Sequence, residues 1–281
     1  MNNIIISNKE NLEKTKEAIL KSGKDKIHII SDFDKTLTTS LVKGTYPSVT
    51  SVLRDQNYLS PDYAIKAKEL YSKYHPIEND PNIPFEQKKK AMEEWWRTHF
   101  ALLIQYGLNK NDIRKSVELS KVKFKEGFAE FMELLKKDNI PLVIVSSSGI
   151  GTYCISLYFE REKKLYQNVH IISNSYEWDE NGKAVAVNEP IIHNMNKDGY
   201  VIRNVTVFET IKDRKNVILL GDTIDDVLMV KGFEYDNLIK IGFLNENVEE
   251  NLEKYKENFD VVLLNDSSLN YVNELLKELM K

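Results

Sequence analysis

Short apolar runs alternate with amphipathic segments along most of the chain after residue 26. The apolar or β-branched runs predict strands at 27–33, 141–147, 169–173, 216–220, 237–242 and 260–264. Runs that lack regular polar alternation are typical of parallel strands covered on both faces. The 3.6-residue spacing of apolar positions between them predicts helices at 126–138, 150–163, 225–231, 247–257 and 268–280. This order of elements predicts an α/β fold built on a doubly wound parallel sheet.

One pair of segments departs from the parallel pattern. Residues 175–187 read SYEWDENGKAVAV, in which two alternating segments surround Asn181 and Gly182. An Asn-Gly pair between alternating segments is a strong signal for a two-residue type I′ turn. We therefore expect a β-hairpin here.

A long insertion follows the first predicted strand. Residues 41–120 contain helical patterns at 60–74, 85–107 and 110–120 but no convincing strand. The usual connection in such a sheet has about 2–6 residues, so an insertion of this length predicts a separate helical unit. We name residues 41–120 the cap segment and assign residues 1–40 and 121–281 to a core that contains the sheet.

Composition narrows the classes of function. The chain has 281 residues, is 42% hydrophobic and carries a formal net charge of −4. It has no basic tract that would follow a phosphate backbone, which argues against a nucleic acid polymer as partner. No run reaches the roughly 20 apolar residues of a membrane span, and the N-terminus lacks a signal-peptide pattern. The single cysteine, Cys154, lies in an apolar stretch and is expected to be a packing residue. We expect a cytoplasmic monomer that does not bind a membrane.

Carboxylates gather at the ends of predicted strands. Asp32 and Asp34 close the first strand and, at positions i and i+2, project to one side. Asp222 follows another apolar strand and should lie at the same edge of the sheet, where open α/β folds bind ligands. Three oxygen donors with no accompanying histidine or cysteine favour a hard cation, and Mg²⁺ fits best.

Other phosphate and metal motifs are missing from these stretches. An EF-hand counted from Asp32 would need glycine and glutamate where the chain has Leu37 and Lys43. The Gly-Ile-Gly at 149–151 has Cys154 where a dinucleotide fingerprint needs glycine or alanine. The sequence contains no Walker A pattern.

Four motifs in order carry a family resemblance. The segments DFDKTLT, VIVSSSG and GDTIDD, with Lys197 between the last two, resemble the motifs of the haloacid dehalogenase superfamily of phosphohydrolases. The segments IISNSYEWDENG, IIHNMNKDG and LIKIGFLNENVEENLEKY, with IENDP and EWW in the cap segment, are similar to one family within it. That family is the cytosolic pyrimidine 5′-nucleotidases, also called cytosolic 5′-nucleotidase III.

The resemblance implies a role for each motif residue. Asp32 would be the nucleophile that forms an aspartyl-phosphate, and Asp34 the general acid and then the general base. Mg²⁺ would be held by Asp32, the backbone carbonyl of Asp34 and Asp222. Lys197 would be a fixed cation on the transferred phosphoryl group, and Ser147 would bind its oxygens.

Three further residues would support this machinery. Asp226 would be an outer carboxylate that orients the metal ligands. Thr36 would stabilise the loop after the first strand. Ser148 would add a hydroxyl near the phosphate, at a position where the family usually has alanine.

The cap segment would recognise the base. By motif match, Glu78 would accept a hydrogen bond from an exocyclic amine and Trp96 would stack on the base. Trp95 and Trp96 cannot share one side of a helix, so one of them is expected in the core. This chain has His99 where animal members of the family have serine or alanine. His99 could contact the substrate or be a packed histidine, which leaves the base preference open.

The implied activity is Mg²⁺-dependent hydrolysis of nucleoside 5′-monophosphates, with CMP or UMP preferred. Two enzymatic alternatives are a capped phosphatase for another small phosphomonoester such as phosphoserine, and a 7-methylguanosine monophosphate nucleotidase. A third is a catalytically silent binding protein on the same scaffold. The complete set of Asp32, Asp34, Lys197 and Asp222 argues against a silent relative, which would gain nothing from four costly polar residues at one site.

Overall fold

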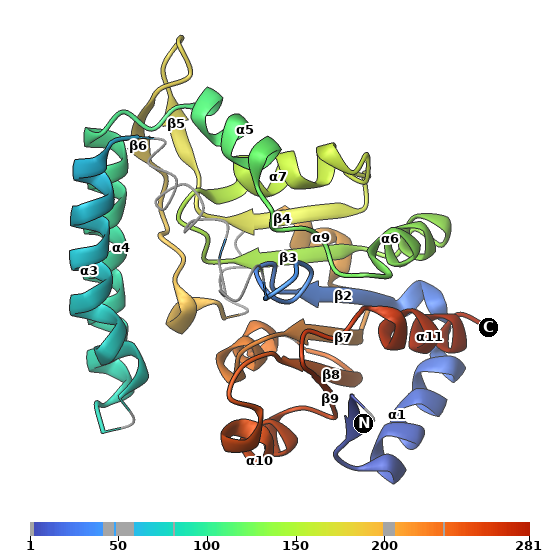
Figure 1. Cartoon of the computed structure of the whole chain (residues 1–281). Helices are drawn as coiled ribbons and strands as arrows, with labels where there is room; N and C mark the ends of the chain where they lie inside the picture. The colour runs from blue at the N-terminus through green and yellow to red at the C-terminus, as the bar shows by residue number, and fades with distance from the viewer. Residues whose placement is uncertain (1–2, 42–47, 49–58, 81, 199–205, 233) are drawn as a thin grey trace.

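A seven-stranded sheet forms the centre of the molecule. The computed structural model describes residues 3–41, 48, 59–80, 82–198, 206–232 and 234–281 (Figure 1). The strands in these residues, in chain order, are β1 (Ile4–Ile6), β2 (Ile27–Ser31), β3 (Leu142–Ser146), β4 (Val169–Ser173), β5 (Tyr176–Trp178), β6 (Ala184–Val187), β7 (Asn216–Gly221), β8 (Asn237–Leu244) and β9 (Val261–Leu264). Seven of them form the central sheet, and β5 and β6 pair with each other in a separate two-stranded sheet. The six strands predicted for the sheet are all present. The order across the sheet is β1-β9-β8-β7-β2-β3-β4, and every neighbouring pair except β1 with β9 is parallel.

Helices and 3-10 helices occupy most of the connections between the strands. They are α1 (Lys9–Ser22), η1 (Lys24–Lys26), α3 (Pro61–Asn79), α4 (Phe85–Gln105), α5 (Lys110–Leu119), α6 (Phe128–Lys137), α7 (Gly151–Arg161), η2 (Asn194–Asn196), α9 (Val207–Ile211), η3 (Ile224–Val230), α10 (Val248–Asn258) and α11 (Asn270–Leu279). The helix expected at 225–231 is therefore a 3-10 helix. None of the helices in the described ranges is both long and apolar enough to cross a membrane.

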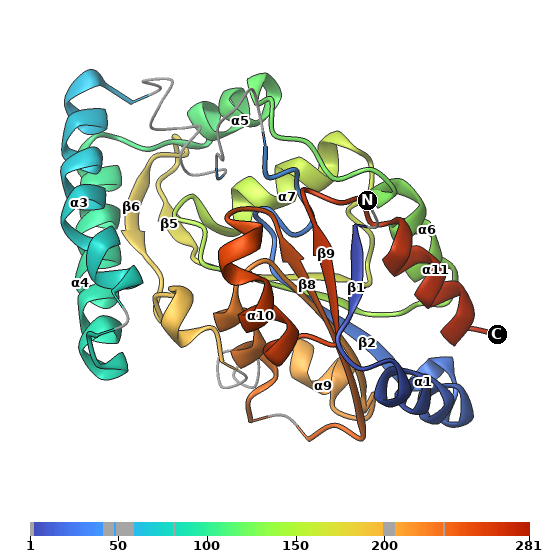
Figure 2. The ribbon, with the colours of Figure 1, turned by 60° about the horizontal axis from the view of Figure 1, so that its bottom comes forward.

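The sheet is covered on both faces, which explains its continuous apolar strands. Side chains alternate along a strand, so Ile29 and Ile30 of β2 enter different hydrophobic clusters. Ile29 packs in a cluster with α1, α6, α7 and α11, whereas Ile30 packs in one with α9 and η3. The tilted view separates these layers (Figure 2). The doubly wound fold class predicted from the sequence is confirmed. Cys154 is buried in the first of these clusters, as expected.

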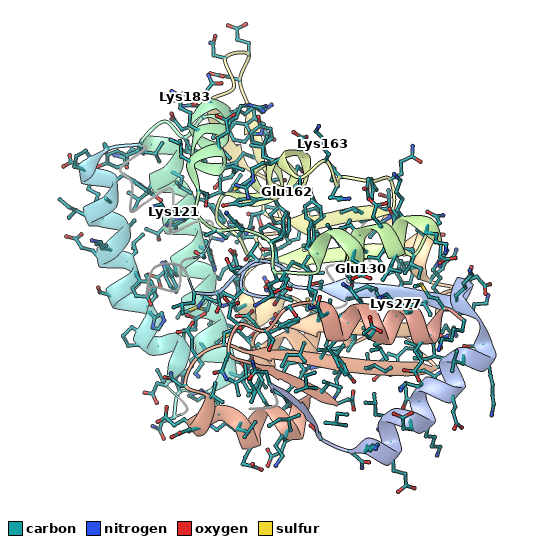
Figure 3. All side chains as sticks on the ribbon, turned by 45° about the vertical axis from the view of Figure 1, so that its right-hand side comes forward. Lys121, Glu130, Glu162, Lys163, Lys183 and Lys277 are labelled. Atoms are coloured by element: carbon teal, nitrogen blue, oxygen red, sulfur yellow. The ribbon has the colours of Figure 1, made fainter. Side chains whose placement is uncertain are left out.

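The first and last elements of the described residues pack against the core. The strand β1 extends the sheet antiparallel to β9, and α1 begins at Asn8, whose side chain accepts a hydrogen bond from Asn11 N. Neither element was predicted from the sequence. At the other end, α11 packs on α6, where Lys277 and Glu130 form a 2.7 Å ion pair (Figure 3).

The helices of the cap segment divide into two groups. Helices α3 and α4 pack on each other beside the carboxyl ends of β2, β3, β4 and β7, whose arrowheads point toward them (Figure 1). Helix α5 packs instead on α7, which belongs to the layer over the sheet. The hairpin of β5 and β6 contacts α4 through β6. Residues 42–47 and 49–58 of the cap segment lie outside the described residues.

The hairpin is present, but the predicted turn type is wrong. Its turn runs from Asp179 to Gly182, with a 3.0 Å backbone hydrogen bond from Gly182 N to Asp179 O. Only Gly182 has a positive φ, of 76°, whereas a type I′ turn needs positive φ at Asn181 as well. The Asp179 carboxylate accepts hydrogen bonds from the backbone N of Asn181 and Lys183, which favours the longer turn. Lys183, labelled in Figure 3, lies between this turn and β6.

Candidate active site at the carboxyl edge of the sheet

Two neighbouring strands bring acidic residues to one place. Strands β2 and β7 are parallel and aligned with Ser31 opposite Leu220. Asp32 N continues this ladder with a 3.0 Å hydrogen bond to Leu220 O, so Asp32 and Asp222 leave the sheet side by side. Oxygen atoms of Asp32, Asp222 and Asp226 all lie within 4.8 Å of one another. The structure thus brings together Asp32 and Asp222 and adds Asp226, which the sequence predicted as an outer residue.

Phe33 orients the first acidic loop. Its ring is fully buried and makes edge contacts with Phe124 and Tyr158 at 5.9 and 5.8 Å. Asp32 directly precedes this anchor, and Asp34 follows it in a turn beyond the end of β2. Asp34 is half-buried, but its carboxylate is not in the group of three.

Lys197 is the cation of this group. It follows η2 and its buried ammonium donates hydrogen bonds to Asp32 and, at 3.3 Å, to Asp226 Oδ1. His193 and Asn196 form a reciprocal capping box around η2, which fixes the backbone that leads to Lys197. The cation is thus held by local structure as well as by its carboxylate partners.

Asp226 is the most constrained of the three carboxylates. Its Oδ2 accepts hydrogen bonds from Asp222 N, Thr223 N and Thr223 Oγ1 at 3.0, 2.9 and 3.0 Å. The space beside it admits only glycine at 221, because a Cβ there would lie 2.5 Å from Asp226 Cβ. Asp226 therefore fixes the loop that carries Asp222. Thr36 Oγ1 also approaches Asp222 Oδ1, at 3.5 Å.

Burial and like charge raise the pKa values of the acidic residues. Burial, with the charge of Asp226, raises the pKa of Asp32 to about 7 even though Lys197 opposes this. Burial and the charges of Asp32 and Asp226 raise the pKa of Asp222 well above its ordinary value. Burial alone would lower the pKa of Lys197, but Asp32 and Asp226 outweigh it and raise that pKa. A bound cation would relieve the repulsion among these carboxylates.

A polar loop follows the neighbouring strand β3. Ser147 Oγ donates a 2.6 Å hydrogen bond to Asn194 Oδ1, while Ser148 Oγ accepts one of 3.4 Å from Ile150 N. Helix α7 then begins at Gly151, which has a φ of 74° and whose Cβ would lie 2.0 Å from Asn174 O. Only glycine fits this position. The loop therefore presents serine hydroxyls beside the start of a helix, an arrangement suited to anions.

The residues predicted to contact a base occupy α3 and α4. Glu78 Oε1 accepts a 2.8 Å hydrogen bond from Asn194 Nδ2, and burial raises the pKa of Glu78. Trp96 is half-buried and stacks on Phe100 at 5.6 Å. His99 is buried beside the rings of Trp96, Phe100 and Tyr63.

Two asparagines of the site were not predicted from the sequence. Asn174 is buried and its side chain joins Ser148 O to both backbone polar groups of Ile192. Asn194 lies between Ser147 and Glu78. Asn174 directly follows β4, so its position at a strand end was the available signal. Asn194 carries no such signal, because both its partners are distant in the sequence.

Solved structures of phosphatases share this fold. The structure of cytosolic 5′-nucleotidase IIIB bound to cytidine matches with a TM-score of 0.84 and 26% sequence identity, over 99% of this chain and 93% of that chain. A phosphoserine phosphatase structure with a phospho-aspartyl intermediate analogue matches at a TM-score of 0.53 and 18% identity, over 88% and 97%. The second likeness concerns the fold alone.

Sequence comparison points to the same group of enzymes. The 7-methylguanosine phosphate-specific 5′-nucleotidase of Mus musculus is 36% identical over 94% of this chain and 88% of that protein. The putative cytosolic 5′-nucleotidase 3 of Caenorhabditis elegans is 39% identical over 90% and 69%. The pyrimidine 5′-nucleotidase (UMPH-1) family model matches residues 35–280. The chain therefore belongs to the UMPH-1 pyrimidine 5′-nucleotidase family.

Proposed function

We propose that this protein is a Mg²⁺-dependent 5′-nucleotidase that hydrolyses nucleoside 5′-monophosphates to nucleoside and phosphate. The observation that carries the proposal is the convergence of Asp32, Asp222 and Asp226 with Lys197 at the carboxyl edge of the sheet. A buried group of acids around one lysine lowers the stability of the folded protein. Binding of a phosphate ester and a cation explains why such a group is present.

Asp32 is the proposed nucleophile. Its carboxylate attacks the phosphorus, and the bond to the nucleoside 5′-oxygen breaks to leave an aspartyl-phosphate. Lys197 holds the attacking carboxylate in place and offsets charge on the phosphoryl oxygens. Asp34 gives a proton to the departing oxygen and then takes one from the water that releases phosphate.

The donor set of the site fits Mg²⁺. It consists of carboxylate oxygens with no histidine or cysteine, which suits a hard divalent ion. Asp32, Asp222 and the backbone carbonyl of Asp34 are the proposed ligands. Asp226 orients Asp222, since three hydrogen bonds already occupy its Oδ2, and Thr36 supports the same loop. The ion, when bound, neutralises phosphate charge so that one anion can approach another.

Phosphate oxygens are proposed to bind at the loop after β3. Ser147 supplies a hydroxyl, and the backbone N–H groups near the start of α7 supply further donors. Ser148 is proposed to add a second hydroxyl. Its contact with Ile150 N supports a role in shaping the loop as well.

The cap segment, residues 41–120, is proposed to select the base. Glu78 would accept a hydrogen bond from an exocyclic amine, and Trp96 would stack on the ring, which contributes roughly 1–3 kcal/mol for an aromatic side chain. His99 is proposed to shape the base site, and its burial among aromatic rings supports a packing role.

Two substrate preferences can be compared directly. A pyrimidine nucleotide is the first candidate, supported by the family description and by the cytidine bound to the similar solved structure. The monophosphate of 7-methylguanosine is the second, because several relatives at 35–36% identity carry that specificity in their names. We also propose a cytoplasmic monomer. The word cytosolic in the names of similar proteins supports that location.

Phosphate release is the decisive assay. CMP, UMP and 7-methylguanosine monophosphate are each incubated with Mg²⁺ or with EDTA, and kcat/KM is compared. We expect turnover that EDTA abolishes and that Asp32→Asn removes while the folded state remains. Absence of metal-dependent turnover on every nucleotide would reject the proposal.

A further inference from the structure

A series of side-chain hydrogen bonds joins the proposed phosphate site to the proposed base site. Ser147 Oγ donates to Asn194 Oδ1 at 2.6 Å, and Asn194 Nδ2 donates to Glu78 Oε1 at 2.8 Å. Ser147 follows β3, Asn194 begins η2 and Glu78 lies near the end of α3. One amide therefore connects the core with the cap segment.

The polarity of this series is fixed by chemistry. An ionised carboxylate only accepts hydrogen bonds, so the donor group Nδ2 of Asn194 must face Glu78. The Oδ1 side must then face Ser147, whose hydroxyl donates to it. A serine hydroxyl has a single proton, and a proton given to Asn194 is not available to a phosphate oxygen.

We infer that Asn194 is a positioning residue that couples base binding at Glu78 to phosphate binding at Ser147. In this inference the base amine donates to Glu78 Oε1 and so takes the acceptor that Asn194 Nδ2 uses. The freed amide no longer has to present Oδ1 to Ser147, so the serine hydroxyl can turn to the phosphate. The coupling is positive, and linkage requires each ligand to strengthen the other by the same factor. This inference rests on the proposed function, because it assigns Ser147 to phosphate and Glu78 to the base.

Asn194 lies in the loop of residues 188–197, which runs from the end of β6 to Lys197. The other contacts of this loop make it suited to carry the coupling. Two more residues of the cap segment contact it, since Arg97 forms a 2.7 Å ion pair with Glu189 and Glu93 lies 3.5 Å from His193. The loop then ends at Lys197, which contacts Asp32. The contact through Asn194 joins a residue of the cap segment to Ser147, a proposed phosphate-binding residue, through side chains alone.

The test uses the two proposed products, so that no turnover interferes. Calorimetry measures the Kd of cytidine with Mg²⁺, in the absence and presence of saturating inorganic phosphate. We expect phosphate to lower the cytidine Kd of the native protein by about fivefold or more, within the usual range of coupling factors. In Asn194→Ala that ratio is expected to fall to about one. Glu189→Gln, which loosens the same loop without touching Ser147, is the matched control and should keep the native ratio.

A second variant separates coupling from a loss of structure. Asn194→Asp keeps the size of the side chain and an acceptor for Ser147, but its carboxylate cannot donate to Glu78, so the phosphate effect on the cytidine Kd should again fall to about one. Urea unfolding of Asn194→Ala and Asn194→Asp shows whether each variant is folded as stably as the Glu189→Gln control. A folded Asn194→Asp protein that keeps the native ratio would overturn the coupling.

The outcomes distinguish this inference from the proposed function. The native protein can hydrolyse CMP with metal while phosphate lowers the cytidine Kd by the same factor in the native protein and in Asn194→Ala. That result overturns the coupling and leaves the nucleotidase proposal intact. Absence of metal-dependent turnover of CMP, UMP and 7-methylguanosine monophosphate by the native protein overturns the nucleotidase proposal and the coupling with it. A cytidine Kd of the native protein that is the same with and without phosphate also overturns the coupling.

Discussion

Asp226 offers the sharpest structural prediction at the site. Its side chain is 2% exposed, and its Oδ2 accepts hydrogen bonds from Asp222 N, Thr223 N and Thr223 Oγ1. Its Oδ1 lies 3.3 Å from Lys197 Nζ. Alanine at this position leaves all these donors without their acceptor, whereas asparagine keeps one carbonyl oxygen for the backbone donors and turns an NH₂ group toward Lys197.

The size of each effect follows from these contacts. A hydrogen bond to a charged group contributes about 1.5–3 kcal/mol, and contributions that share one oxygen do not add fully. Lys197 keeps Asp32 as its ion-pair partner when Asp226 is removed, so the cost is mainly that of the lost hydrogen bonds. We expect Asp226→Ala to lower the free energy of unfolding by about 1.5–3 kcal/mol. Asp226→Asn should lower it by about 1–3 kcal/mol, the cost of the mismatched donors.

Urea unfolding without added metal measures this stability, and an activity assay measures the metal requirement. Because Asp226 orients a metal ligand, Asp226→Asn should raise the Mg²⁺ concentration for half-maximal rate by about 10–100-fold. Asp225→Asn is the matched control, because Asp225 is the adjacent acid of η3 and lies outside the group of three. An Asp226→Ala protein whose free energy of unfolding stays within about 1 kcal/mol of the native value would refute this role.

Three further predictions concern helix geometry, pH and base selection. Gly151→Ala should lower the free energy of unfolding by more than about 1 kcal/mol, because φ is positive and the new Cβ would meet Asn174 O at 2.0 Å; unchanged denaturant midpoints would contradict this. Burial lowers the pKa of His28 and His193 to about 4, below the value of about 6.5 in an unfolded chain. The unfolded state therefore binds more protons, so this contribution to stability is complete above pH ~6.5 and declines toward pH ~4. Urea midpoints measured across that range should show a smaller decline for His28→Gln, and an identical decline would exclude the explanation. Glu78→Ala should lower kcat/KM for CMP relative to p-nitrophenyl phosphate, which has no base; an unchanged ratio would remove Glu78 from base recognition.

The strands and the strand-end acids could be predicted because their signal is local. Continuous apolar runs mark buried parallel strands, and each run that ends in a polar residue marks the ligand-binding edge. Asp32 and Asp222 were expected at one edge on these grounds, and the parallel register of β2 and β7 explains why they meet. The short strand β1 has partly exposed isoleucines and pairs at the sheet edge, so its three residues carry little signal.

The contacts between the cap segment and the core could not be predicted in the same way. Asn194 is 116 residues from Glu78 and 47 residues from Ser147, and no local pattern relates them. The prediction of the hairpin turn failed for a different reason, because two local signals compete there. Asp179 redirects it through its own hydrogen bonds, which outweigh the preference of Asn181 and Gly182 for a type I′ turn.

The nucleophilic role of Asp32 is the central claim, and trapping the covalent intermediate tests it most directly. The protein is mixed with a nucleoside monophosphate substrate and Mg²⁺, quenched in acid during turnover and digested with trypsin. Mass spectrometry then examines the peptide from Ile27 to Lys35, which contains both Asp32 and Asp34. We predict one phosphoryl group on Asp32, absent from EDTA-treated samples. A phosphoryl group on Asp34 or on another residue, or continued turnover by Asp32→Asn, would contradict the account.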